Sequence, residues 1–140
     1  MYTLDTNILV YATDEAFPLH RQARRLRDRA ARDEEAVLCY PVLLEFFAVV
    51  TDPRRVENPL APGEAWEEVE RYLGAFQVLY PRPRTLRLLG ELVRQYEITR
   101  QGIFDALVVA LMLDHGVEEL YTANETDFRQ FEEIELGEWR

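Results

Sequence analysis

The chain opens with Tyr2-Thr3-Leu4-Asp5-Thr6-Asn7-Ile8-Leu9-Val10-Tyr11-Ala12, in which three polar residues separate two apolar stretches. Asp, Thr and Asn all cap helix N-termini, so residues 2–4 are predicted to form a short buried strand that leads straight into a helix. The rest of the chain repeats this alternation of short apolar strands with longer helical stretches. The pattern predicts an α/β fold with a doubly wound parallel sheet.

Turn residues and hydrophobic periodicity set the expected element boundaries. Proline begins or precedes several helices, and Gly116 is expected to end the last long helix in a left-handed conformation. Strands are predicted at residues 2–4, 36–39, 77–80, 119–121 and 134–136, and helices at about 8–12, 18–32, 41–51, 64–75, 85–96 and 103–115. No repeat or long linker interrupts the chain, so residues 1–140 are predicted to form one domain.

The composition narrows the possible chemistry. The chain contains no serine and no lysine, which excludes serine nucleophiles, Schiff-base lysines and the phosphate-binding P-loop. Its single cysteine, Cys39, and its two histidines argue against a tetrahedral zinc site. The 26 acidic residues, which give a net charge of −10, favour chemistry based on carboxylates and hard cations such as Mg²⁺ or Mn²⁺.

The sequence also bears on the expected compartment. No apolar run approaches the roughly eighteen residues that a spanning helix needs, and the N-terminus lacks the basic and apolar stretches of a signal peptide. A single cysteine excludes an internal disulfide. A cytoplasmic protein without a membrane partner is therefore expected.

Four acidic residues are predicted to meet at one edge of the sheet, because sites in such sheets form at the carboxyl ends of the strands. Asp5 follows the first strand, and Glu45 lies one helical turn after the second. Asp105 lies in the first turn of the helix 103–115, and Asp127 follows the fourth strand in a loop. Asp5, Glu45 and Asp105 stand among apolar residues, where a carboxylate is costly unless it is paired or bound to metal.

Helix capping is the alternative interpretation of these acids. Asp5 precedes one helix and Asp105 lies in the first turn of another, and both positions favour a negative charge. Capping does not explain Glu45, which lies too far into its helix. We therefore favour a metal site, with Asp5 and Asp105 as direct ligands and Glu45 as a ligand or as the group that orients a water.

These residues also resemble a known family in their order and spacing. The resemblance rests on Asp5-Thr6-Asn7 after an N-terminal strand, the helix with Glu45, Asp105-Ala106 with Ala110, and Thr122-x-Asn124-x-x-Asp127-Phe128. These motifs are similar to those of the PIN domain, and in particular of the VapC-type ribonuclease toxins of toxin–antitoxin pairs. The resemblance covers residues 2–128. It implies a five-stranded parallel sheet sandwiched between helices and an RNA-cleaving site that uses Mg²⁺ or Mn²⁺.

The resemblance also implies a role for each matching residue. The catalytic and metal-binding roles fall on Asp5, Glu45, Asp105 and Asp127, and a supporting polar shell consists of Thr6, Asn7, Thr122 and Asn124. Some family members carry an acid in place of Asn124, which leaves open whether Asp127 binds metal directly or through water. The implied reaction is in-line attack on a phosphate by a cation-activated water. An RNA substrate, an antitoxin partner and a homodimer are implied as well.

Other functions remain as alternatives. Aspartyl-phosphate proteins on a similar sheet use a lysine beside the phosphorylated aspartate, and this chain has none. A stand-alone RNA-processing PIN nuclease, and a catalytically silent PIN module that binds RNA or a partner, would share the fold. Metal-dependent cleavage separates a nuclease from the silent module.

A run of arginines has two interpretations. Six of them lie within twelve positions, at residues 21, 24, 25, 27, 29 and 32. They form either a solvated helix face or a face that contacts phosphates.

Overall fold

A five-stranded sheet is the centre of the protein, whose computed structural model describes residues 1–140. Its strands are β1 (Tyr2–Leu4), β2 (Ala36–Cys39), β3 (Gln77–Leu79), β4 (Glu119–Tyr121) and β5 (Glu135–Leu136). They lie in the order β3-β2-β1-β4-β5, and every neighbouring pair is parallel. The α/β class and the five-stranded parallel sheet are therefore confirmed.

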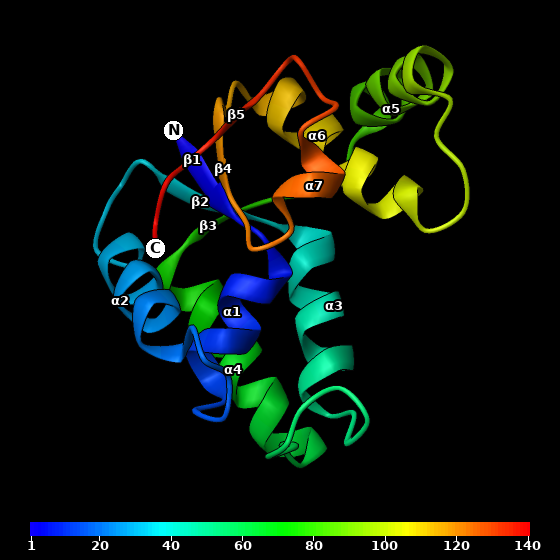
Figure 1. The fold of residues 1–140 in the computed structure, drawn as a ribbon. Coiled ribbons are helices and arrows are strands. Elements are labelled where there is room, and N and C mark those ends of the chain that lie inside the picture. The colour runs from blue at the N-terminus through cyan, green and yellow to red at the C-terminus, as the bar shows by residue number, and fades with distance from the viewer.

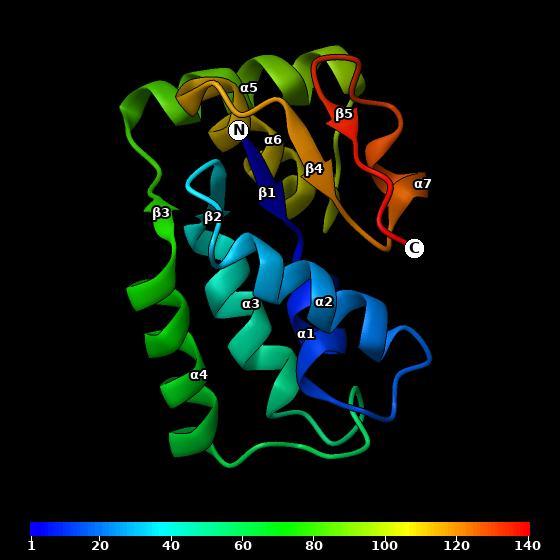
Figure 2. The ribbon, with the colours of Figure 1, turned by 90° about the vertical axis from the view of Figure 1, so that its left-hand side faces the viewer.

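Helices cover the sheet from two sides. They are α1 (Thr6–Thr13), α2 (His20–Ala30), α3 (Tyr40–Val50), α4 (Pro62–Ala75), α5 (Pro83–Tyr96), α6 (Gly102–His115) and α7 (Glu125–Phe128). Figure 1 shows α1 to α4 on one side of the strands and α5 with α6 on the other, and the turned view in Figure 2 agrees. Helix α1 packs between α2 and α3, as Figure 1 shows. None of the helices is long and apolar enough to cross a membrane.

The apolar runs of the sequence become the core. Every residue of β2 is buried, as expected for a central strand that is covered on both faces. Helix α6 buries residues around most of its circumference, which explains why its sequence is apolar without a clear polar face. The largest fully buried side chains include Phe46 and Phe128.

Hydrogen bonds fix the carboxyl edge of the sheet. The backbone N–H of Asp5 donates to Tyr121 O at 2.9 Å and so joins the end of β1 to the end of β4. Inside the sheet, Thr3 Oγ1 donates to Val37 O at 2.7 Å, which satisfies a buried hydroxyl. The residues that follow β1 and β4 are thus held side by side.

Several element boundaries differ from the sequence prediction by one or two residues. Helix α2 begins at His20 and ends at Ala30, because Pro18 lies in a turn in which His20 N–H donates to Phe17 O at 3.0 Å. Strand β3 ends at Leu79, one residue earlier than expected. The prediction that Asp127 lies in a loop is wrong, because the short helix α7 forms there around the buried Phe128. Gly116 has a φ of 70°, as predicted for a left-handed cap.

The C-terminal residues are fastened to β4 and to the turn that follows it. Gly137 N–H donates to Leu120 O at 2.9 Å, and a Cβ at position 137 would overlap the ring of Tyr121, so only glycine fits. Two residues later, Trp139 Nε1 donates to Thr122 O at 3.0 Å. The tail therefore supports the turn that carries Thr122.

Candidate active site

A cleft of about 670 Å³ contains three of the four predicted acids. Asp5 comes from the end of β1, Glu45 from α3 and Asp105 from α6. Helices α3 and α6 contact each other and form its walls. The cleft is the place at the carboxyl edge of the sheet where the sequence predicted a site.

Asp5 is both a helix cap and part of the cleft. Its Oδ1 accepts a hydrogen bond from Thr6 N–H at 2.8 Å, while Oδ2 accepts one from Thr122 Oγ1 at 2.8 Å and one from Asn7 Nδ2 at 3.3 Å. Only 8% of the residue is exposed. Burial raises the pKa of this carboxyl, and the Asp127 charge adds to that effect against the three hydrogen bonds. The capping and site interpretations of Asp5 are therefore compatible.

Glu45 lies on the open side of α3, next to the exposed Leu44. The core side of this helix consists of other residues, among them Phe46 and Val49. The sequence-based view that its apolar neighbours bury Glu45 is therefore wrong, because helical geometry turns them to a different face. Partial desolvation is nevertheless the main cause of the raised pKa of Glu45, and the charge of Asp5 raises it further.

Asp105 is the third carboxylate of the cleft, and its pKa is strongly raised. It lies in the first turn of α6 and is partly exposed. Burial, followed by the charges of Asp5, Asp127 and Glu45, raises its pKa from 3.8 to about 7. The four predicted acids are therefore close enough to interact electrostatically, and the pKa of Asp105 responds to the charges of the other three.

Asp127 lies beside the cleft and does not line it. Its Oδ2 accepts a hydrogen bond from Asn124 Nδ2 at 2.6 Å, within the turn that begins α7. Its charge nevertheless raises the pKa of both Asp5 and Asp105. Asp127 therefore affects the acids of the cleft through the electric field of its charge. It also holds the side chain of Asn124, whose backbone N–H donates to Thr122.

The predicted polar shell forms a network around Asp5. Asn7 Oδ1 accepts from Ala123 N–H at 3.0 Å, and Thr122 Oγ1 accepts from Asn124 N–H at 2.9 Å. Asn7 and Thr122 also donate directly to Asp5, so these side chains fix the position of its carboxylate. The Thr6 hydroxyl is buried without a full hydrogen bond, although it is near enough to Glu45 to lower the pKa of that carboxyl.

The donor set suits a hard cation. The acids offer only oxygen atoms, which Mg²⁺ and Mn²⁺ prefer, and a cation would relieve the repulsion that raises the pKa of Asp105. No three of the carboxylates are arranged as a ready-made ligand group, so a cation would bind here only after side-chain movements. The unsatisfied Thr6 hydroxyl leaves one further buried oxygen at this place.

Other reactive groups of the chain are accounted for elsewhere. Burial raises the pKa of the Cys39 thiol to about 12, so this cysteine is not a nucleophile. Asp114 is buried in α6 and accepts hydrogen bonds from Arg82 Nε at 2.8 Å and from Thr85 Oγ1 at 2.6 Å, which locks α6 to α5. Neither residue lines the cleft.

Sequence reasoning missed three residues that line the cleft with the acids: Arg55, Tyr40 and Phe104. Arg55 lies in the turn-rich stretch after α3, where no periodic pattern marks a residue as functional. Tyr40 and Phe104 lie in the first turns of strongly apolar helices and so resemble core residues. Exposure, which the sequence does not reveal, distinguishes them from the core.

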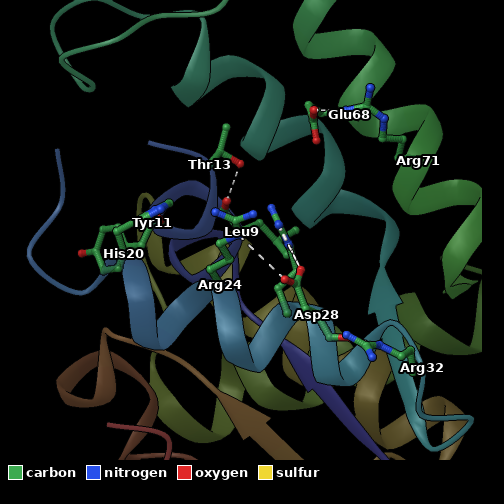
Figure 3. Close-up of polar contacts among 10 residues, drawn as sticks. Leu9, Tyr11, Thr13, His20, Arg24, Asp28, Arg32, Glu68 and Arg71 are labelled. Carbon is green, nitrogen blue, oxygen red and sulfur yellow. Dashed lines mark hydrogen bonds and ion pairs between the residues drawn. The ribbon is translucent and has the colours of Figure 1, made fainter. Parts of the chain in front are cut away.

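The arginine-rich helix α2 is separated from the cleft by α1. Figure 3 shows Arg24 directed toward the Asp28 carboxylate on α2 and Arg32, which follows the helix, directed toward the Asp28 backbone carbonyl. Glu68 and Arg71 pair with each other on α4. Arg27 also binds Asp28, at 3.0 Å. Half of the arginine run thus pairs locally, and none of it lines the carboxylate cleft.

The fold and the cleft define an α/β domain with a carboxylate site at the carboxyl edge of a parallel sheet. The model of the PIN domain family matches residues 2–134, which is nearly the whole chain. The chain belongs to the PIN domain family.

Curated relatives match over the same length. The chain is 33% identical to ribonuclease VapC48 of Mycobacterium tuberculosis, over 96% of this chain and 94% of that protein. It is 29% identical to ribonuclease VapC24 of the same organism, over 94% of this chain and 91% of the relative. Both matches cover nearly the whole of this chain.

Solved structures share the fold. The structure of VapBC2 from Rickettsia felis, bound to a DNA fragment from its promoter, matches with a TM-score of 0.72 and 19% identity, over 99% of this chain and 98% of that one. VapC20 of M. tuberculosis, a toxin that cleaves the sarcin–ricin loop, matches with a TM-score of 0.70 and 19% identity, over 96% and 99%. At this identity the likeness establishes the architecture alone.

Proposed function

We propose that this protein is a metal-dependent endoribonuclease and the toxin of a type II toxin–antitoxin pair. The observation that carries the proposal is the cleft in which Asp5, Glu45 and Asp105 lie together, where burial and the charges of Asp5, Asp127 and Glu45 raise the pKa of Asp105 to about 7. The ribonuclease names of the relatives give the substrate class.

Each acid has a distinct task in this proposal. Asp5, held by three hydrogen bonds, and Asp105 bind the cation, and Glu45 binds it or orients the attacking water. Asp127 contributes negative charge and binds directly or through water. When bound, Mg²⁺ or Mn²⁺ activates water for in-line attack and neutralises the leaving oxygen. No covalent intermediate on the protein is needed.

The direct test is a broad RNA-cleavage screen of the purified protein with Mn²⁺, with Mg²⁺ and with EDTA. We expect RNA cleavage products only when a cation is present. Without a cation, the carboxylates repel both the attacking hydroxide and the phosphate. Cleavage that persists in EDTA would contradict the metal role. RNA binding without any cleavage would instead identify a silent PIN module.

We further propose a small antitoxin that silences the enzyme at the same cleft. A desolvated group of carboxylates is a good partner for a guanidinium, which binds two oxygens at once. The partner is therefore expected to insert an arginine, or less favourably a lysine, flanked by apolar residues that pack on the walls of the cleft. A homodimer of the toxin remains a prediction from the family.

Competition with metal tests this mode of inhibition. We expect calorimetric titration with the product of the adjacent small gene to show weaker binding in Mn²⁺ than in EDTA, because cation and guanidinium would share the carboxylates. A partner whose affinity ignores both Mn²⁺ and the Asp105→Asn change would contradict occlusion of the cleft. Absence of a small neighbouring gene would favour a stand-alone RNA-processing nuclease.

A further inference from the structure

Arg55 is the only basic residue among those that line the carboxylate cleft. Its neighbour Arg54 binds Asp52 at 3.3 Å, whereas Arg55 forms no ion pair within 4.0 Å. Its charge reaches Glu45, whose pKa it lowers. The cleft thus contains one unpaired guanidinium beside the acids.

The backbone around Arg55 is fixed although its side chain is free. Arg55 N–H and Val56 N–H both donate to Asp52 O, at 2.9 and 3.1 Å, and Asp52 Oδ1 accepts from Arg54 N–H at 2.9 Å. Val56 is only 4% exposed and anchors the turn in the core. An anchored turn with a free guanidinium is well suited to binding an anion, since little backbone order must be gained on binding.

Aromatic rings line the same cleft and are unusually exposed. Phe104, directly before Asp105, is 52% exposed, and Tyr40 at the start of α3 is 36% exposed. The Tyr40 ring packs on Tyr80 with centroids 5.2 Å apart and planes 33° apart. Exposed π-faces beside a site for phosphate chemistry are what single-stranded nucleic acids use for base stacking.

The overall charge makes local contacts decisive. With a net charge of −10, the protein as a whole repels a polyanion, so its net charge supplies no affinity for RNA. Affinity for RNA therefore depends on a few well-placed groups. Arg55 can bind a phosphate bidentately, and the rings supply contacts that do not depend on charge.

We propose that the cleft is a binding site for single-stranded RNA in which Arg55 binds a phosphate next to the scissile one and Phe104 and Tyr40 stack on the adjoining bases. The inference rests on the proposed ribonuclease function and adds its substrate-binding residues. A cleft of about 670 Å³ has room for a nucleotide, since ligand sites commonly span about 300–1,000 Å³. The bases of double-stranded RNA are already stacked on one another, so they are not free to stack on the two aromatic rings.

Binding is best measured without turnover. All variants are made in the Asp105→Asn background, so that the RNA is not cleaved. The probe is a ten-nucleotide single-stranded RNA of mixed sequence that carries fluorescein. Fluorescence anisotropy in EDTA then measures its affinity in the absence of a cation. We expect Arg55→Gln to weaken binding about tenfold and to reduce the salt dependence by about one phosphate contact. Phe104→Leu should weaken it by a similar factor, and a duplex of the same sequence should bind less tightly than the single strand.

Arg54→Gln is the matched control. It removes the same charge as Arg55→Gln at the neighbouring position, where the arginine side chain is already paired with Asp52. It should leave affinity within about twofold. Equal losses in Arg54→Gln and Arg55→Gln would overturn the proposal in favour of a general charge effect. A Phe104→Leu change that dissociates a dimer and leaves RNA affinity intact would assign the rings to an interface between two copies.

The failure of this inference is distinguishable from failure of the proposed function. If Arg55→Gln binds RNA normally while Asp105→Asn abolishes cleavage, the binding site is wrong and the nuclease assignment stands. If the unaltered protein neither binds nor cleaves RNA, the proposed function itself is wrong.

Discussion

Replacing Asp105 with asparagine is expected to abolish RNA cleavage, by more than about 100-fold, and to leave the fold intact. Losing a residue that merely orients a metal ligand commonly costs about 10–100-fold, so losing a charged ligand should cost more. The amide nearly preserves the shape of the carboxylate, and Asp105 is only partly buried. Single-turnover cleavage in Mn²⁺ with equal amounts of both proteins measures the effect. Cleavage at the normal rate would remove Asp105 from the site.

The same variant separates a metal ligand from a helix cap by its stability without metal. The pKa of Asp105 is raised to about 7 from 3.8, so the folded state is penalised as pH rises through that interval. We therefore expect Asp105→Asn to be at least as stable as the unaltered protein near pH 7 in EDTA, with the difference vanishing near pH 4. Thermal melting across this range measures it. A clearly less stable variant at pH 7 would indicate a structural cap.

The largest loss of stability is expected from Asp114→Asn. Asp114 does not line the carboxylate cleft and has no proposed role in cleavage. The Asp114 side chain is fully buried and accepts hydrogen bonds from Arg82 and Thr85 that join α6 to the start of α5. An amide cannot accept all of them, and hydrogen bonds to a buried charged group are worth about 1–3 kcal/mol when one partner is lost. Urea denaturation at pH 7 should show a loss of this size, with unchanged cleavage of RNA by the folded protein.

Asp28→Asn is the control for this prediction. Asp28 also binds two arginines, Arg24 and Arg27, but its side chain is 43% exposed. Exposed pairs contribute less than about 1 kcal/mol, so this variant should lose little. The Arg82 and Thr85 hydrogen bonds hold the pKa of Asp114 at about 2, so its stabilisation should fade as pH drops from 4 toward 2. A loss in Asp28→Asn as large as in Asp114→Asn would contradict the difference in burial.

The sequence was sufficient for the fold because its local signals agree with the tertiary arrangement. Polar capping residues follow β1 directly, β2 is apolar throughout, and Gly116 ends α6 as its type predicts. The parallel sheet places Asp5 at its carboxyl edge, and the position of Asp105 in the first turn of its helix was expected to bring it to the same edge. Their inclusion in one cleft was therefore predictable from the order of elements.

Side-chain direction and exposure were beyond the sequence. Glu45 was expected among apolar neighbours, yet helix geometry places it on the open side of α3. Asp127 was expected in a loop, but burial of Phe128 stabilises a short helix there. Arg55 and Phe104 reach the cleft through contacts between segments far apart in the chain, which no local pattern encodes.

The most direct test of the carboxylate site is anomalous scattering from crystals soaked in Mn²⁺. The proposed function predicts a Mn²⁺ peak within coordination distance of Asp5 and Asp105, with Glu45 and Asp127 turned toward it directly or through water, and no peak there in Asp105→Asn. A Mn²⁺ ion bound only elsewhere, or a peak that persists unchanged in Asp105→Asn, would contradict the assignment of this cleft as the metal site.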